Sequence, residues 1–139
     1  MKILFLFLSV LLFSNEIKTT AKLQVEITNI KNKKGTLRMG IYLPNEKFGE
    51  SKPGVTKTID VKSTENQTVT FELEPGRYAL AIYHDLNGND AMDKNFVGIP
   101  KEPYGFSKNF RPKFSAPSFE DCAFEVLADG KNISVKLTD

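Results

Sequence analysis

Apolar and polar residues alternate along most of the chain after residue 22, the period of a β-strand with one buried face. The alternation predicts strands at Leu23–Ile27, Leu37–Leu43, Val69–Leu73, Cys122–Leu127 and Ile133–Leu137. Arg77–His84 is apolar in both phases, so we expect a central strand covered on both faces. Thr56–Val61 can add a short strand. Because no 3.6-residue stripe is sustained, the pattern predicts an all-β fold, a single antiparallel β-sandwich.

Turn signals separate these stretches, with one exception. Gly35, the Glu74–Gly76 turn and the Asp129-Gly130 pair each mark a short reversal of the chain. The exception is Leu86–Ser118, 33 residues without clear periodicity. The usual connection has about 4–6 residues. Because disordered segments are poor in aromatics and this one contains five, we expect one long ordered loop packed on the sandwich.

The N-terminal stretch has the features of a signal peptide. Lys2 is followed by the apolar run Ile3–Phe13, and Thr19-Thr20-Ala21 ends the stretch with small residues. We therefore expect a signal peptide at 1–21, a β-sandwich domain at 22–139, and export to the periplasm or the extracellular space. A buried core helix or an uncleaved anchor is the alternative. After cleavage we expect no transmembrane segment.

Composition excludes several kinds of function. Lys and Arg total 19 and Asp and Glu total 17, a net charge of +2 that is too balanced for a nucleic-acid-binding surface. One Cys and one His exclude an intrachain disulfide and a Cys/His zinc site. Gly-rich phosphate loops are also missing from the sequence. The sequence thus favours a partner other than DNA or RNA.

One block of the sequence is specific enough to indicate a family. His84–Asn109 reads HDLNGNDAMDKNFVGIPKEPYGFSKN, and it resembles the bacterial secreted family called domain of unknown function 2141. Two positions depart from the family pattern, since Asp90 replaces a frequent Gly and Lys108 an Asn. Leu73–Tyr78 is similar to the family's L-x-P-G-x-Y segment and to transthyretin-related sandwiches. The resemblance implies an immunoglobulin-like or transthyretin-like fold, and it implies no function.

The start of this block has the spacing of a calcium loop. Oxygen-bearing groups stand at alternating positions: Asp85, Asn87, Asn89 and Asp93, with the carbonyl of Ala91 between them. Such groups can converge on one calcium ion. A complete EF-hand is excluded because Asp90 replaces the turn Gly and Phe96 replaces the closing Glu, although Asp90 or Glu102 can complete a looser site. The alternative is that Asn and Asp build consecutive turns without metal.

His84 is the candidate for acid–base chemistry. It ends the expected central strand beside Asp85, where it can act as a general base or hydrogen-bond the long loop as a structural residue. A hydrolase would combine His84 with a loop carboxylate, and Asp85, Asp93 and Glu102 can also provide a carboxylate pair of the glycosidase kind. No convincing nucleophile accompanies them, so a non-enzymatic protein is favoured. Cys122 shares a phase with apolar neighbours and is expected in the core.

The long loop also contains candidate ligand-binding residues. Tyr104, Phe106 and Phe110 can form an exposed platform for a sugar or peptide, or they can close a core beneath the loop. With His84 and Asn109, the residues Tyr104 and Phe106 are the predicted ligand-binding set. We therefore expect an exported, non-enzymatic module of the cell envelope, structural or binding an envelope polymer or protein through this loop. A hydrolase remains the alternative.

Overall fold

The computed structural model describes residues 18–138, so most of the predicted signal peptide lies outside the described residues. The elements in chain order are β1 (Ala21–Thr28), β2 (Thr36–Tyr42), β3 (Val55–Asp60), β4 (Gln67–Leu73), β5 (Gly76–Asp85), β6 (Tyr104–Phe106), the short 3₁₀ turn η1 (Ser107–Asn109), α1 (Phe119–Cys122), β7 (Phe124–Val126) and β8 (Lys131–Lys136). Ala21, after which cleavage is predicted, is the first residue of β1 and pairs with Leu73. Among the described residues, no helix is long and apolar enough to span a membrane.

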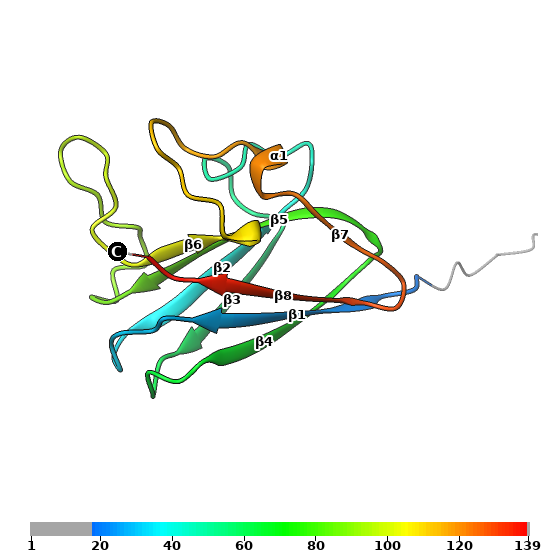
Figure 1. Cartoon of the computed structure of the whole chain (residues 1–139), viewed down its shortest axis with the longest axis horizontal. Coiled ribbons are helices and arrows are strands. Elements are labelled where there is room, and N and C mark those ends of the chain that lie inside the picture. The colour runs from blue at the N-terminus through cyan, green and yellow to red at the C-terminus, as the bar shows by residue number, and fades with distance from the viewer. Residues whose placement is uncertain (1–17, 139) are drawn as a thin grey trace, which may run out of the picture.

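The strands form two sheets that enclose one main core, consistent with a β-sandwich (Figure 1). One sheet has the order β4-β1-β8, and the other has the order β3-β2-β5-β6, with β7 also on β5. The expectation of a purely antiparallel sandwich is wrong in one place, because β1 and β8 pair in parallel. The sequence does not reveal this pairing, because side chains alternate in the same way in parallel and antiparallel strands. The two strands are also far apart in the chain.

Alternation correctly predicts most of the buried positions. Along β1 every second residue from Ala21 to Ile27 is buried, and those between are exposed. In β5, Leu80 and Ile82 lie in the main core, whereas Ala79 on the opposite face belongs to a second cluster with Tyr42, Phe48, Phe119 and Cys122. The expectation that this strand is central and covered on both faces is therefore confirmed. Cys122 is fully buried, and burial raises the pKa of its thiol to about 12.

The long segment after β5 returns to the sheet and joins the two layers. β6 pairs with Ala81–Tyr83, and β7 pairs with Gly76–Tyr78, so the two short strands follow each other along one edge of β5. Tyr104 and Thr138 exchange two backbone hydrogen bonds, of 2.9 and 2.7 Å. A Cβ on Gly105 would lie 2.7 Å from Val135 Cγ1. The absence of a side chain there lets β6 approach the strand β8 of the other sheet, as Figure 1 shows.

Several predicted strand boundaries differ from the observed ones, among them those at Cys122 and Leu43. Cys122 ends the one-turn helix α1, so the strand expected from Cys122 begins only at Phe124. Ser118 caps that helix through a reciprocal capping box with Asp121, a local signal that outweighs the alternation. Leu43 lies beyond the end of β2 and is exposed, because the chain leaves the sheet at Tyr42.

Candidate functional site

The loop that follows β5 begins at a buried carboxylate. Asp85 is fully buried and accepts hydrogen bonds from Gly88 N at 2.7 Å, Asp90 N at 3.0 Å and Arg38 Nε at 3.0 Å. Burial raises the pKa of Asp85, but the amides of Asp90 and Gly88 and the Arg38 guanidinium together outweigh it, so the pKa lies below its ordinary value. The loop therefore folds around a charged group that the protein itself neutralises.

Arg38 provides the positive charge for this arrangement. It lies on β2, and besides Asp85 it donates a hydrogen bond to Asp90, which is exposed. Asp90 has φ 65°, and Gly88 has φ 73°. Both values are in the left-handed region, which favours Gly and which Asp tolerates. The contact with Arg38 thus holds Asp90, one of the two residues that depart from the family pattern.

A second buried carboxylate ties the start of the loop to its return. Glu102 is 5% exposed, and its two oxygens accept hydrogen bonds from Leu86 N at 2.9 Å and Asp93 N at 3.2 Å. The backbone of His84 donates to Pro103 O at 2.8 Å just beside it. Residues 86 and 102 are therefore clamped together at the base of a projecting loop.

The predicted calcium ligands lie together in this loop, bound to one another. Asp93 accepts hydrogen bonds from the side-chain amides of Asn87 and Asn89, at 2.5 and 3.0 Å. The side-chain oxygen of Asn87 accepts from Asn89 N, and that of Asn89 accepts from Ala91 N, both at 3.1 Å. These are the consecutive turns of the metal-free alternative. In the described part of the chain, His, Cys, Asp and Glu side chains form no metal-binding group of three or more. Calcium binding stays a prediction.

Beyond this network the chain forms an apolar tip, defined here as Phe96, Val97 and Ile99. Their exposed fractions are 100%, 62% and 59%. The side-chain oxygen of Asn95 accepts hydrogen bonds from Val97 N at 3.0 Å and Ile99 N at 2.9 Å, and Asn95 N donates to Ile99 O at 2.8 Å. Lys101 N donates to Asp93 O at 2.8 Å below the tip. The tip is consequently a hydrogen-bonded turn with its apolar side chains in solvent.

His84, predicted as a base or a ligand-binding residue, lies inside the protein. Its side chain is fully buried, and Nε2 lies 2.7 Å from Lys34 O, to which it donates. Nδ1 is buried without a hydrogen-bond partner among the described residues. The ring therefore secures the turn before β2, while the contact with the long loop comes from the His84 backbone. A substrate cannot reach this ring from solvent.

The other predicted ligand-binding residues lie on the sheet side of the loop. Phe106 is half-buried and packs against Phe48 and Tyr104, each with ring centroids 5.7 Å away. Asn109 accepts a hydrogen bond from Lys136 N at 2.8 Å and donates to Ser134 O at 3.3 Å, so its side chain extends the edge of β8. Thus Phe106 contributes to core packing and Asn109 to strand pairing, and the structure does not bring either together with His84.

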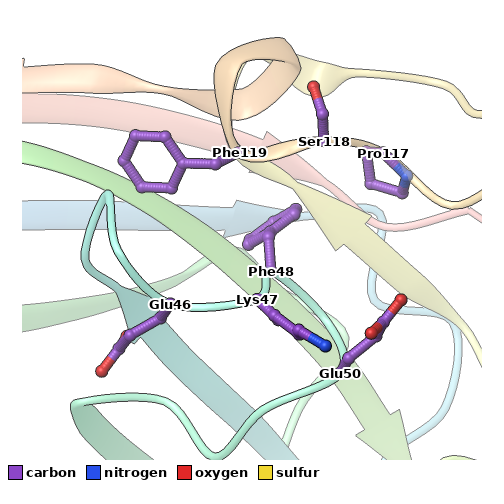
Figure 2. Close-up of a pocket in the computed structure, with 7 residues that line it drawn as sticks. All are labelled: Glu46, Lys47, Phe48, Glu50, Pro117, Ser118 and Phe119. Carbon is purple, nitrogen blue, oxygen red and sulfur yellow. The ribbon is translucent and has the colours of Figure 1, made fainter.

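A shallow hollow of about 390 Å³ lies between the β2–β3 connection and the start of α1. Phe48 and Phe119 form its apolar part, and Glu46, Lys47 and Glu50 contribute charges of both signs (Figure 2). Figure 2 shows the Phe48 ring between these two segments, and both rings are largely buried. The hollow thus lies where two loops pack against each other, and charged side chains form its rim.

Three features of the site are missing from the sequence-based predictions. The sequence alone does not indicate Arg38, because its contact with Asp85 depends on the register of β2 against β5. Ser107 is fully buried, donates to Cys122 O at 2.6 Å and accepts from Leu80 N at 3.0 Å, which joins β5 to the end of α1. The apolar tip did have a signal, because Phe-Val-Gly-Ile is an apolar cluster within an otherwise polar loop.

These features define a small two-sheet β-domain whose central strand leads into a loop built on buried carboxylates. A family model described as "Uncharacterized protein conserved in bacteria (DUF2141)" matches residues 25–135, and the chain belongs to this family. The match confirms the resemblance seen in the sequence, and it includes the whole loop. No curated protein and no solved structure matches the chain.

Proposed function

We propose that this protein is an exported, non-enzymatic binding module of the bacterial cell envelope, with residues 86–118 as its binding surface. The proposal includes two further parts. The sandwich has an immunoglobulin-like or transthyretin-like arrangement, and the Asp/Asn loop holds a calcium ion. The observation that supports a binding role is the apolar tip, whose side chains are exposed while Asp85 and Glu102 beneath it are buried.

The physical argument is that a loop selected for stability alone would bury its apolar side chains and expose its carboxylates. Exposed large apolar residues that lie together mark interaction surfaces, whereas single ones are ordinary. Buried carboxylates are costly unless hydrogen-bonded, and here they hold the backbone of the loop in one conformation. A fixed backbone lowers the entropy lost on binding. The arrangement therefore suits a surface that presents a preformed contact.

The hydrolase alternative is less well supported. It requires His84 within reach of a substrate proton, at about 2.6–3.2 Å or through one water. The His84 ring is fully buried, and Nε2 already donates to Lys34 O. Asp85 is fully buried beside it, and its carboxylate is engaged by three donors. Neither group has the exposure that the reaction needs.

Cell fractionation tests the proposal. The protein is expressed in a bacterial host, and the soluble exported fraction, the cytoplasm and the sedimented envelope are compared by immunoblot. The tip variant Phe96→Ser/Val97→Ser/Ile99→Ser is compared with a control, Leu43→Ser/Val55→Ser/Leu127→Ser, which removes three exposed apolar side chains elsewhere. We expect wild type and control in the envelope fraction and the tip variant in the soluble exported fraction. A cytoplasmic wild type, or a tip variant that still sediments, would overturn the proposal.

A further inference from the structure

The apolar tip is held away from the protein rather than folded onto it. Other aromatic residues of the same segment, Phe106 and Phe110, pack against the second cluster. Phe96 is completely exposed, and the hydrogen bonds of Asn95 keep its neighbours Val97 and Ile99 from turning inward. The chain thus places three adjacent apolar side chains at the end of a projection, visible as the yellow-green loop at the left of Figure 1.

Positive charge surrounds this tip. Lys94 and Lys101 flank it, both are exposed, and neither forms an ion pair within residues 18–138. From residue 94 to residue 118 there are five basic side chains and one acidic side chain. That acidic residue is Glu102, which is buried. The whole chain has a net charge of only +2, so the excess of positive charge is concentrated in this segment.

The acidic groups nearest the tip are hydrogen-bonded at the base of the loop, where Asp93 keeps its negative charge because its partners are neutral. Asp90 is paired with Arg38, and Asp93 accepts hydrogen bonds from two Asn side chains. The tip therefore presents an apolar end with two exposed lysines, Lys94 and Lys101, beside it. This arrangement lets the apolar side chains enter the boundary of the acyl chains while the lysines stay at the level of anionic headgroups.

We propose that the apolar tip and its flanking lysines dock this protein on an anionic lipid bilayer; this rests on the proposed binding role and names the partner. The tip is a convex projection, which can enter a fluid surface that has no groove prepared for it. The positive charge extends over residues 94–118, as a broad negative surface would require. A protein partner would need a pocket matched to the tip, and the test below distinguishes it from a bilayer.

A second loop repeats the pattern. Phe114 is fully exposed, and Arg111 and Lys113 precede it. Figure 1 shows this loop, before α1, projecting to the same side of the sheets as the loop that carries the apolar tip. Two projections with aromatic ends and basic flanks would fix the orientation of the domain on a surface, where one alone would leave it free to tilt.

Vesicle flotation tests this inference. The processed protein, with its N-terminus determined by mass spectrometry, is mixed with vesicles of phosphatidylcholine or of phosphatidylcholine and phosphatidylglycerol in equal parts. We expect flotation with the mixed vesicles, and much less with phosphatidylcholine alone or in about 0.5 M salt. The tip variant Phe96→Ser/Val97→Ser/Ile99→Ser should bind at least about tenfold more weakly. Every variant has the same N-terminus, so differences report the substituted side chains.

The charge contribution is measured separately. Lys94→Gln/Lys101→Gln should weaken binding by about fivefold per lysine, whereas Lys52→Gln/Lys62→Gln, at exposed lysines outside the segment, should leave it unchanged. No flotation of the wild type, or equal flotation of the tip variant, overturns the inference. If the tip variant is still lost from the cell envelope in that case, the proposed binding role stands and its partner is not a lipid. Flotation without envelope retention would overturn the role alone.

Discussion

Asp85→Asn tests whether the buried carboxylate organises the loop. The substitution keeps the size of the side chain but removes its charge and replaces one acceptor oxygen with a donor NH₂ group. The carboxylate accepts from Gly88 N, Asp90 N and Arg38 Nε. An Asn side chain has one acceptor oxygen, so at least one of these donors faces another donor. Arg38 also loses its charge partner, although Asp90 remains.

The expected loss of stability follows from these contacts. Hydrogen bonds to a charged group contribute about 1.5–3 kcal/mol each, and an unsatisfied buried donor costs about 1–3 kcal/mol. Breaking a buried ion pair costs about 3–5 kcal/mol, and less here because the Arg38 side chain is 27% exposed. We expect the free energy of unfolding to fall by about 3 kcal/mol, which lowers the melting temperature by roughly 10 °C.

The assay is thermal and urea unfolding followed by circular dichroism, with Asp60→Asn as the control at an exposed position at the end of β3. Hydrogen exchange adds a local measurement, because the amides of Gly88 and Asp90 should lose protection in Asp85→Asn. A melting temperature within about 3 °C of the wild type would refute the reasoning. So would unchanged exchange at both amides, since the carboxylate would then not be holding the loop.

Three further outcomes follow from the same contacts. Because the pKa of Asp85 lies below its ordinary value in the folded state, its stabilising contribution is complete above about pH 4 and is lost as the pH falls through the folded value; the urea midpoint should therefore fall more steeply with acid in the wild type than in Asp85→Asn, and parallel curves would contradict this. Millimolar calcium should raise the melting temperature and give a saturable heat in calorimetry, both lost in Asp93→Ala, because an ion that binds only the folded protein stabilises it; no heat and no shift would leave the loop to its hydrogen-bonded turns alone. Gly105→Ala should destabilise the fold by about 1–3 kcal/mol in urea unfolding, because the new Cβ would meet Val135 Cγ1 at 2.7 Å; an unchanged midpoint would show that β6 and β8 can separate freely.

The sequence predicts the strands because burial of one face repeats every second residue, and the repeat is local. Pairing is not local. The parallel contact of β1 with β8 and the ion pair of Arg38 with Asp85 both depend on which strand lies next to which. Short elements are also not predicted, because the three residues of β6 give too little alternation to recognise a strand. The capping box of Ser118 was visible in the sequence, but a four-residue helix has no apolar period to support it.

For the loop, the sequence predicts which residues gather but not their environment. The Asp/Asn spacing correctly brings Asn87, Asn89 and Asp93 together. Spacing carries no information on whether a metal or an arginine balances the charge, because the arginine comes from another strand. The aromatic residues show the same limit, since Phe106 and Phe96 are ten positions apart in one segment, yet one packs inward and the other is exposed. Only the returning path of the chain along β5 and β8 separates them.

The polarity of this loop is the strongest reason to look for its function there. Asp85 and Glu102 are among the few buried polar side chains of the described residues, and Phe96 and Phe114 are the most exposed large apolar ones. All four residues lie within the stretch that the family model matches, residues 25–135. Burying a carboxylate and exposing an aromatic ring are each unfavourable unless another contact compensates. The amides at the base of the loop compensate only for the buried carboxylates. Nothing within residues 18–138 covers the exposed aromatics. We propose that a partner outside the described residues supplies the compensating contact, and the flanking lysines favour a negatively charged one.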